Sequence, residues 1–192
     1  MKKNSILLFL IVVIACKQKE KEKTPTETFF PVLSFIKSQV AHVDTSFYQI
    51  TKVTWPDSLH TDTTYIKRED FRGLAEDFLE IPDISVPKYK DLYAEEKFYD
   101  EGMNKVILTY RPKNSDTSII QRQEVLINHN QFGDNVNSFI IYLTITNEDS
   151  SVEKKLLWQV DRSFNVVTSV QKPGQTETSQ RFKVIWNEND DE

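Results

Sequence analysis

The residue types that could perform chemistry in this 192-residue chain begin with its three histidines. His42 and His60 each precede an aspartate by two positions, at Asp44 and Asp62. This spacing could bring an imidazole and a carboxylate to one metal ion. Neither pair has a third or fourth ligand at the usual metal-site spacing, and His129 stands apart from both. We therefore expect no metal site, and solvated side chains at these positions.

The carboxylates between residues 69 and 80 are candidates for general acids and bases. Glu69, Arg72 and Glu76 are three and four positions apart, however, which is the spacing of exposed ion pairs on a helix. No serine stands in a Gly-x-Ser-x-Gly or Ser-x-x-Lys motif. Four glycines are too few for a phosphate-binding loop. The sequence thus predicts no catalytic residues, no cofactor and a protein that is not an enzyme.

Aromatic side chains are the remaining candidates for a site. Tyr and Trp are enriched where proteins or sugars are recognised, because each offers a large apolar area with a polar tip. Core packing is the commoner use, so a site is expected in the least regular segment, residues 83–102. The predicted ligand-binding residues there are Tyr89, Tyr93, Phe98 and Tyr99.

The single cysteine marks a change of character near the start of the chain. Lys2 and Lys3 precede an apolar run over residues 6–15, and after Cys16 the chain becomes almost wholly charged. A basic start followed by an apolar run is the layout of a secretory signal peptide. Ten helical residues cover about 15 Å, roughly half of the ~30 Å hydrocarbon core of a bilayer. The run is therefore too short to predict a spanning helix.

The four residues Val13-Ile14-Ala15-Cys16 resemble the lipobox of bacterial lipoproteins. The resemblance implies cleavage between Ala15 and Cys16 and acylation of the Cys16 thiol, which makes the chain a membrane-anchored lipoprotein. Two or three acyl chains hold a protein on a membrane, since each buried methylene contributes about 0.8 kcal/mol. Lys17 directly after the cysteine implies delivery to the outer membrane, at its periplasmic face or the cell surface. The alternative is an ordinary signal peptide whose cleavage site includes a cysteine.

Composition divides the chain into four parts. They are a signal peptide (1–15), the lipidated cysteine with a disordered polar tether (16–28), one α+β domain (29–186) and an acidic tail (187–192). Loss of Lys2 and Lys3 from the 24 basic residues leaves 22 against 29 acidic residues, a net charge of −7. An acidic domain of this kind is not expected to bind nucleic acid. With its cysteine acylated, the domain has no thiol for a disulfide.

The elements that must position these residues follow from the period of the apolar pattern. Helical spacing predicts helices over residues 29–43 and between residues 65 and 81, and alternation predicts a strand over 47–55. From residue 103 onward the alternation continues. It predicts strands over 106–110, 118–127, 136–146, 152–160, 165–171 and 179–186. The segment Lys172-Pro173-Gly174-Gln175 predicts a type II turn.

Short links between successive strands favour an antiparallel meander. An antiparallel sheet with one apolar face must cover that face, and the predicted helices carry matching apolar stripes. The expected fold class is α+β, with N-terminal helices packed on a curved antiparallel β-meander of about six to seven strands.

Three functions remain open at this point. The first is a lipid-anchored, non-catalytic envelope protein that binds a protein or another envelope component. The second is a carrier for an apolar ligand inside the curved sheet, which needs a cavity where Phe139, Leu143 and Trp158 would otherwise fill the interior. The third, an envelope hydrolase, needs a deep polar pocket with converging histidine or acid side chains. The body is similar to uncharacterised lipoproteins of Bacteroidota in composition and in segments such as LLWQVD (156–161), a resemblance that implies no activity.

Overall fold

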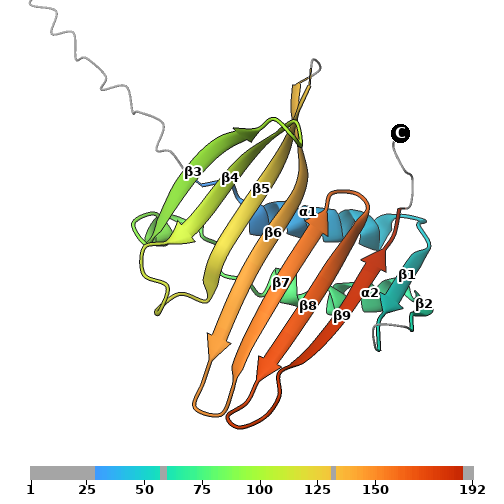
Figure 1. Cartoon of the computed structure of the whole chain (residues 1–192). Coiled ribbons are helices and arrows are strands. Elements are labelled where there is room, and N and C mark those ends of the chain that lie inside the picture. The colour runs from blue at the N-terminus through green and yellow to red at the C-terminus, as the bar shows by residue number, and fades with distance from the viewer. Residues whose placement is uncertain (1–28, 57–59, 131–132, 188–192) are drawn as a thin grey trace, which may run out of the picture.

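The computed structural model describes residues 29–56, 60–130 and 133–187. The predicted signal peptide, Cys16 with its cleavage site after Ala15, the polar tether and nearly all of the acidic tail lie outside the described residues. The described part forms one antiparallel sheet of nine strands in the order β2-β1-β9-β8-β7-β6-β5-β4-β3. In Figure 1, α1 and α2 lie behind this sheet, on one of its faces.

The helical elements are few and short. They are α1 (Val32–Thr45), α2 (Arg68–Leu74), α3 (Glu76–Leu79) and the 3-10 helix η1 (Pro87–Tyr89). The first strands along the chain are β1 (Ile50–Thr54), β2 (Asp62–Ile66), β3 (Tyr93–Asp100) and β4 (Lys105–Pro112). They are followed by β5 (Ile120–Asn130), β6 (Gly133–Thr146), β7 (Ser151–Gln159), β8 (Ser163–Gln171) and β9 (Thr178–Ile185).

The sheet is larger than expected. From β3 to β9 each strand pairs antiparallel with the next, and the β1–β2 hairpin adds at the other end because β1 pairs with β9. The prediction of six to seven strands is wrong because it omits β2 and β3. These are the two edge strands, and nearly all of their side chains are exposed on both faces. A strand exposed on both sides carries no apolar alternation to detect.

The helices also differ from the prediction of an N-terminal group. Only α1 precedes the described strands, whereas α2 and α3 follow the β1–β2 hairpin. The helix expected between residues 65 and 81 is divided: Tyr65 and Ile66 end β2, and Ala75 leaves helical geometry at φ −89° and ψ 3°. The coarse prediction of a largely antiparallel sheet with a few helices is correct.

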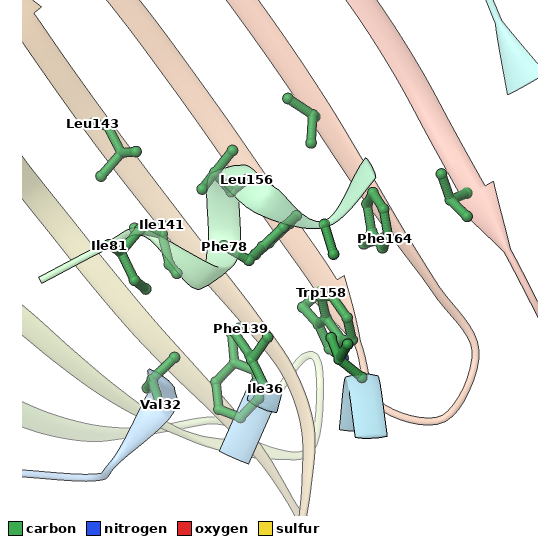
Figure 2. Packing of buried hydrophobic residues seen from close by; sticks show 14 of the residues in the cluster. Val32, Ile36, Phe78, Ile81, Phe139, Ile141, Leu143, Leu156, Trp158 and Phe164 are labelled. Carbon is green, nitrogen blue, oxygen red and sulfur yellow. The ribbon is translucent and has the colours of Figure 1, made fainter. Parts of the chain in front are cut away.

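The helices pack on the sheet through apolar side chains at helical spacing. In α1 these side chains are Val32, Ile36, Val40 and Val43, all buried. Phe71 of α2 meets Trp186 with ring centroids 5.3 Å apart, and Phe78 of α3 meets Trp158 at 5.1 Å, both edge to face. Figure 2 shows Phe78 and Ile36 directed toward Phe139, Trp158 and Phe164 of the sheet.

Side chains fill the space between sheet and helices at this core. Trp158 stacks on Phe164 at 5.3 Å, and Phe139 lies 5.2 Å from the Phe35 ring of α1. Phe139, Trp158 and Phe164 are fully buried, and Leu143 is nearly so. Aromatic pairs in these geometries contribute roughly 0.5–1.5 kcal/mol each beyond the area they bury. The described interior is thus a packed aromatic core.

The turn predicted at residues 172–175 is confirmed. The Gln175 N–H donates to the Lys172 carbonyl at 3.1 Å, and Gly174 has φ +70°. Pro173 supplies the fixed φ of the preceding position, and glycine takes the positive φ without steric cost. The turn therefore begins the chain reversal between β8 and β9.

Candidate functional site

A mostly apolar pocket of about 220 Å³ lies where η1, the start of β3 and the β4–β5 connection meet. Its apolar wall consists of Pro82, Tyr89, Leu92, Tyr93 and Ile119. The remaining lining comes from the polar residues Asp91, Lys113, Asn114, Thr117 and Ser118. We call this site the tyrosine pocket. It combines apolar area with hydroxyl, amide and charged groups at one place on the surface.

Local backbone structure positions the two tyrosines. Pro87 opens η1, where its fixed φ suits the first helical position. The Tyr89 N–H donates to the Val86 carbonyl at 3.0 Å, and the Leu92 N–H donates to the Tyr89 carbonyl at 2.9 Å. These turns bring the Tyr89 ring to 6.3 Å from the Tyr93 ring, edge to face. The pair is therefore held by the backbone as well as by ring contact.

Tyr93 is the fixed member of the pair. It is 5% exposed, and its hydroxyl donates to the Ile120 carbonyl at 3.3 Å. Burial raises the pKa of Tyr93, an effect that a hydrogen bond with Ser118 partly offsets. The phenol consequently stays neutral in the physiological range and serves as a polar anchor for an otherwise apolar wall.

The rim of the pocket exposes two large apolar side chains. Leu92 is 52% exposed and Ile119 is 48% exposed. The Lys113 N–H donates to the Leu92 carbonyl at 2.8 Å, which ties the segment before β3 to the end of β4. Lys88 Nζ lies 4.7 Å from the centroid of the Tyr89 ring. Apolar side chains left in water beside a concavity are typical of contact sites.

The structure brings together two of the four predicted ligand-binding residues. Tyr89 and Tyr93 share the tyrosine pocket, but Phe98 and Tyr99 lie toward the other end of β3. As neighbours on a strand, Phe98 and Tyr99 face opposite sides of the sheet. Tyr99 donates its hydroxyl to Asn104 Oδ1 at 2.5 Å. The sequence analysis assigned neither rim residue to a site. Leu92 lies in the irregular segment, and Ile119 falls within the strand expected over 118–127, whereas the observed strand β5 begins at Ile120.

The histidines and carboxylates take structural partners. The Asp44 carboxylate accepts a hydrogen bond from Arg72 at 2.6 Å, so Arg72 links α2 to α1 instead of forming the expected pairs within its own helix. His129 Nδ1 lies 2.6 Å from Asp134 Oδ1 on the exposed β5–β6 hairpin. Across residues 29–56, 60–130 and 133–187, no three His, Cys, Asp or Glu side chains are grouped so that they could hold a metal ion.

A second depression, of about 410 Å³, lies beside the β7–β8 turn and has polar walls. Two of its amide side chains, Asn137 and Gln159, are engaged within the protein. Asn137 Oδ1 accepts hydrogen bonds from Lys105 Nζ at 2.9 Å and Ser138 Oγ at 3.2 Å, and Gln159 Oε1 accepts one from Ser163 Oγ at 2.7 Å. Groups already satisfied in this way offer less to a ligand than the tyrosine pocket does.

Comparison with known proteins gives no family for this chain. No protein-family profile, curated protein or solved structure matches it. No helix within the described ranges is both long enough and apolar enough to cross a membrane. What the tyrosine pocket can do therefore follows from its own chemistry: apolar contact by the tyrosines and the rim, and polar contact by Asp91 and Lys113.

Proposed function

We propose that this chain is a lipid-anchored, non-catalytic protein of the cell envelope that binds a partner protein through the tyrosine pocket. Acyl chains on Cys16 attach it to the outer membrane, and the polar tether separates the domain from the lipid. The observation that carries the binding role is the exposure of Leu92 and Ile119 beside the buried Tyr93. Exposed apolar anchors around a concavity are typical of protein contact sites.

The size of the pocket favours a protein partner over a small molecule. About 220 Å³ is below the ~300–1,000 Å³ of most small-molecule sites. One apolar or aromatic side chain of a partner suits this volume, and the Leu92 and Ile119 side chains then surround it at the rim. A central anchor shielded by neighbouring apolar contacts is the usual arrangement of a binding hot spot.

A carrier with its ligand inside the sheet has no comparable support. Phe139 and Trp158 occupy the space where an apolar ligand would lie, and both contact aromatic side chains of the helices. A metal-dependent envelope hydrolase likewise has no group of metal-ligating side chains among the residues that the structure describes. The tyrosine pocket is thus the feature on which the proposal depends.

Site-specific photo-crosslinking tests the proposed contact. A benzophenone amino acid placed at Leu92 or Ile119, in the full chain in its own cells, should give a discrete cross-linked product. The matched control is Met103, which is 48% exposed but lies in the β3–β4 turn, at the end of β3 opposite the pocket. The same product from all three positions, or no product from Leu92 and Ile119, contradicts the proposal.

The partner identified by crosslinking is then tested in purified form. Tyr89→Ala should weaken its binding by at least about tenfold, because the substitution removes one wall of the pocket. Tyr48→Ala is the matched control, since Tyr48 is a partly exposed tyrosine before β1. Equal affinities for wild type and Tyr89→Ala would remove the tyrosine pocket from the interface.

The lipid anchor is tested separately. Cells fed a labelled palmitate should incorporate it into the wild-type chain but not into Cys16→Ser, and only the wild type should fractionate with the outer membrane. Protection of the wild-type chain from added protease in intact cells separates the periplasmic face from the cell surface. An unlabelled wild-type chain, or an outer-membrane location for Cys16→Ser, rejects the anchor and leaves the pocket experiment intact.

A further inference from the structure

The sheet face opposite the helices carries a row of cationic and aromatic side chains across five strands. Residues paired directly across an antiparallel sheet share a face, and Tyr142 alternates with Ile141, which faces the core. The row is formed by consecutive cross-strand partners and by the residue that follows β1. In order they are Arg122, Tyr142, Lys155, Val167, Arg181 and Trp55. We call this line the cationic row.

Aromatic rings hold the cations of this row in place. The Arg122 guanidinium carbon lies 4.0 Å from the Tyr142 ring centroid, and Lys155 Nζ lies 5.5 Å from the same ring. The Arg181 guanidinium carbon lies 3.9 Å from the Trp55 centroid. An arginine stacked on a ring keeps the N–H groups of its edge in a fixed plane, which suits two-pronged binding of a carboxylate.

A depression of about 360 Å³ lies beside the cationic row. Its walls come from the row and from the side chains beside it: Tyr142, Lys155 and Val167 of the row, and Gln121, Leu143, Thr144, Glu153, Lys154 and Ser169. The Thr144 and Ser169 hydroxyls can donate to or accept from the hydroxyl groups of a sugar. The Gln121 amide nitrogen already donates to the Ser115 and Ser118 carbonyls, so only its oxygen is left to accept. A tyrosine beside them offers an apolar surface for the C–H face of a sugar ring.

The spacing of the cations indicates the kind of anion. Arg122, Lys155 and Arg181 lie on β5, β7 and β9, so successive cations are two strands apart. With neighbouring strands about 4.8 Å apart, the backbone positions of the cations repeat about every 10 Å. The Arg122 and Lys155 charges both lie over the Tyr142 ring, and the Arg181 charge lies over Trp55. A chain of sugar rings with a carboxylate on every second ring has charges at a similarly wide spacing. The whole chain is acidic, at net charge −5, so a cationic line is a local feature of this face.

Other polyanions fit the row less well. A nucleic-acid strand carries one charge per about 3.4 Å, far denser than the cations here. A bilayer surface is a plane and would also meet Glu124 and Glu153, which lie on the same face beside the row. The Glu124 carboxylate is 3.3 Å from Arg122 Nε, so it orients the guanidinium and engages one of its nitrogens. A single linear chain can follow the row past Glu124, and an uncharged sugar ring in the depression can donate hydrogen bonds from its hydroxyl groups to Glu153.

We propose that the cationic row binds a carboxylated oligosaccharide, with its carboxylates on Arg122, Lys155 and Arg181 and one sugar ring in the adjoining depression. The ligand chain runs across the strands, roughly along the line of the cross-strand pairs. This site is on the opposite face of the sheet from the helices and involves none of the residues of the tyrosine pocket. It therefore stands or falls independently of the proposed protein partner.

Isothermal titration calorimetry on the chain from residue 16, with Cys16→Ser to keep it free of lipid, tests the proposal. The probes are a hyaluronan oligomer, which has a carboxylate on every second ring, its carboxyl-reduced neutral counterpart, and vesicles of phosphatidylglycerol and phosphatidylcholine. The acidic oligomer should bind, more weakly as salt concentration rises, while the neutral oligomer and the vesicles should not. Vesicle binding without oligomer binding, or equal binding of the two oligomers, overturns the proposal.

Variants assign the binding to the row. Lys155→Gln should weaken binding of the hyaluronan oligomer by about threefold to tenfold, and Tyr142→Ala should do the same whereas Tyr142→Phe should not. Lys37→Gln is the matched control, because Lys37 is an exposed cation on α1, at the other side of the sheet. Near-ultraviolet circular dichroism verifies that each variant is folded. Unchanged affinity in folded Lys155→Gln and Tyr142→Ala excludes the cationic row as the site.

Discussion

Tyr110 on β4 is a fully buried phenol near the point where the chain enters the domain. The Phe30 N–H donates to its Oη at 3.1 Å, and the Phe29 ring lies 5.0 Å from its ring. Burial is the main cause that raises the pKa of Tyr110 above its ordinary value of 10.0, and Glu95 adds to the shift. The hydrogen bond from Phe30 opposes the shift in part. Tyr110 therefore links the first described residues to the interior of the sheet.

This shift predicts how stability depends on alkaline pH. In the unfolded chain Tyr110 loses its proton near pH 10, but in the folded chain it keeps the proton to higher pH. This difference in pKa stabilises the folded chain fully below about pH 10. The stabilisation is lost as the pH rises toward the pKa of Tyr110 in the folded chain, at up to about 1.4 kcal/mol per pH unit. Tyr110→Phe should flatten this decline, measured as the free energy of unfolding in urea from about pH 8 to pH 12.

The matched control for this prediction is Tyr65→Phe, since Tyr65 is 76% exposed. Its decline with pH should equal that of the wild type. Tyr110→Phe also removes the acceptor for Phe30, so it should lower stability by about 1 kcal/mol at neutral pH. The pKa shift is tested by how steeply the free energy of unfolding falls with pH, and not by the loss of stability at neutral pH. If Tyr110→Phe declines with pH as steeply as the wild type, another group causes the decline.

At the scale of elements, the sequence predicted the strands that bury one face and missed the two strands whose faces are both exposed. Strands with an apolar face, such as β6 and β7, were found within a few residues of their observed bounds. The edge strands β2 and β3 pair on one side and are solvated on both faces, so neither leaves a period-two pattern. Their placement depends on pairing with β1 and β4, which is information that the local sequence does not contain.

Two glycines with equal room for a side chain are expected to respond in opposite directions. Beyond the adjacent residues and, for Gly73, the backbone of its own helix, no heavy atom lies within 4 Å of a Cβ built on Gly174 or on Gly73. Gly174 has φ +70° in the β8–β9 turn, a conformation that costs an L-residue about 1 kcal/mol or more. Gly174→Ala should therefore lower the free energy of unfolding by about that amount, measured by urea denaturation.

Gly73→Ala serves as the internal comparison. Gly73 lies in α2 without a positive φ, and alanine there reduces the entropy of the unfolded chain and favours the helix. This variant should gain about 0.5–1 kcal/mol in the same assay. Destabilisation of both variants by the same amount would mean that steric room, and not backbone geometry, decides their effects.

For the candidate site, the sequence indicated the region but not the arrangement. Tyr89 and Tyr93 meet because the η1 turn folds the chain back before β3 begins. Tyr93 and Tyr99 are six residues apart on an extended strand, or about 20 Å, so they cannot share one small pocket. A group of aromatics in one segment predicts a common site only when the backbone between them turns.

For the molecule as a whole, one aromatic cluster joins the helices to the sheet. Phe78 of α3 lies 5.1 Å from Trp158 and 5.3 Å from Phe164, ring to ring, and all three are fully buried. Loss of the Phe78 ring leaves a cavity at the contact between layers. Phe78→Ala should cost about 3–5 kcal/mol, which is a large part of the ~5–15 kcal/mol stability of a typical domain.

The same shared core predicts that helices and sheet unfold together. Far-ultraviolet circular dichroism and the fluorescence of buried Trp158 and Trp186 should report one midpoint in urea, in the wild type and in Phe78→Ala. Phe47→Ala is the matched control, because Phe47 is fully exposed and its loss should not change the midpoint measurably. If instead the circular dichroism signal is lost at lower urea than the fluorescence, the helices are an independently unfolding layer. A packed interior makes the first result the expected one, since removal of α3 would expose Trp158 and Phe164 to water at once.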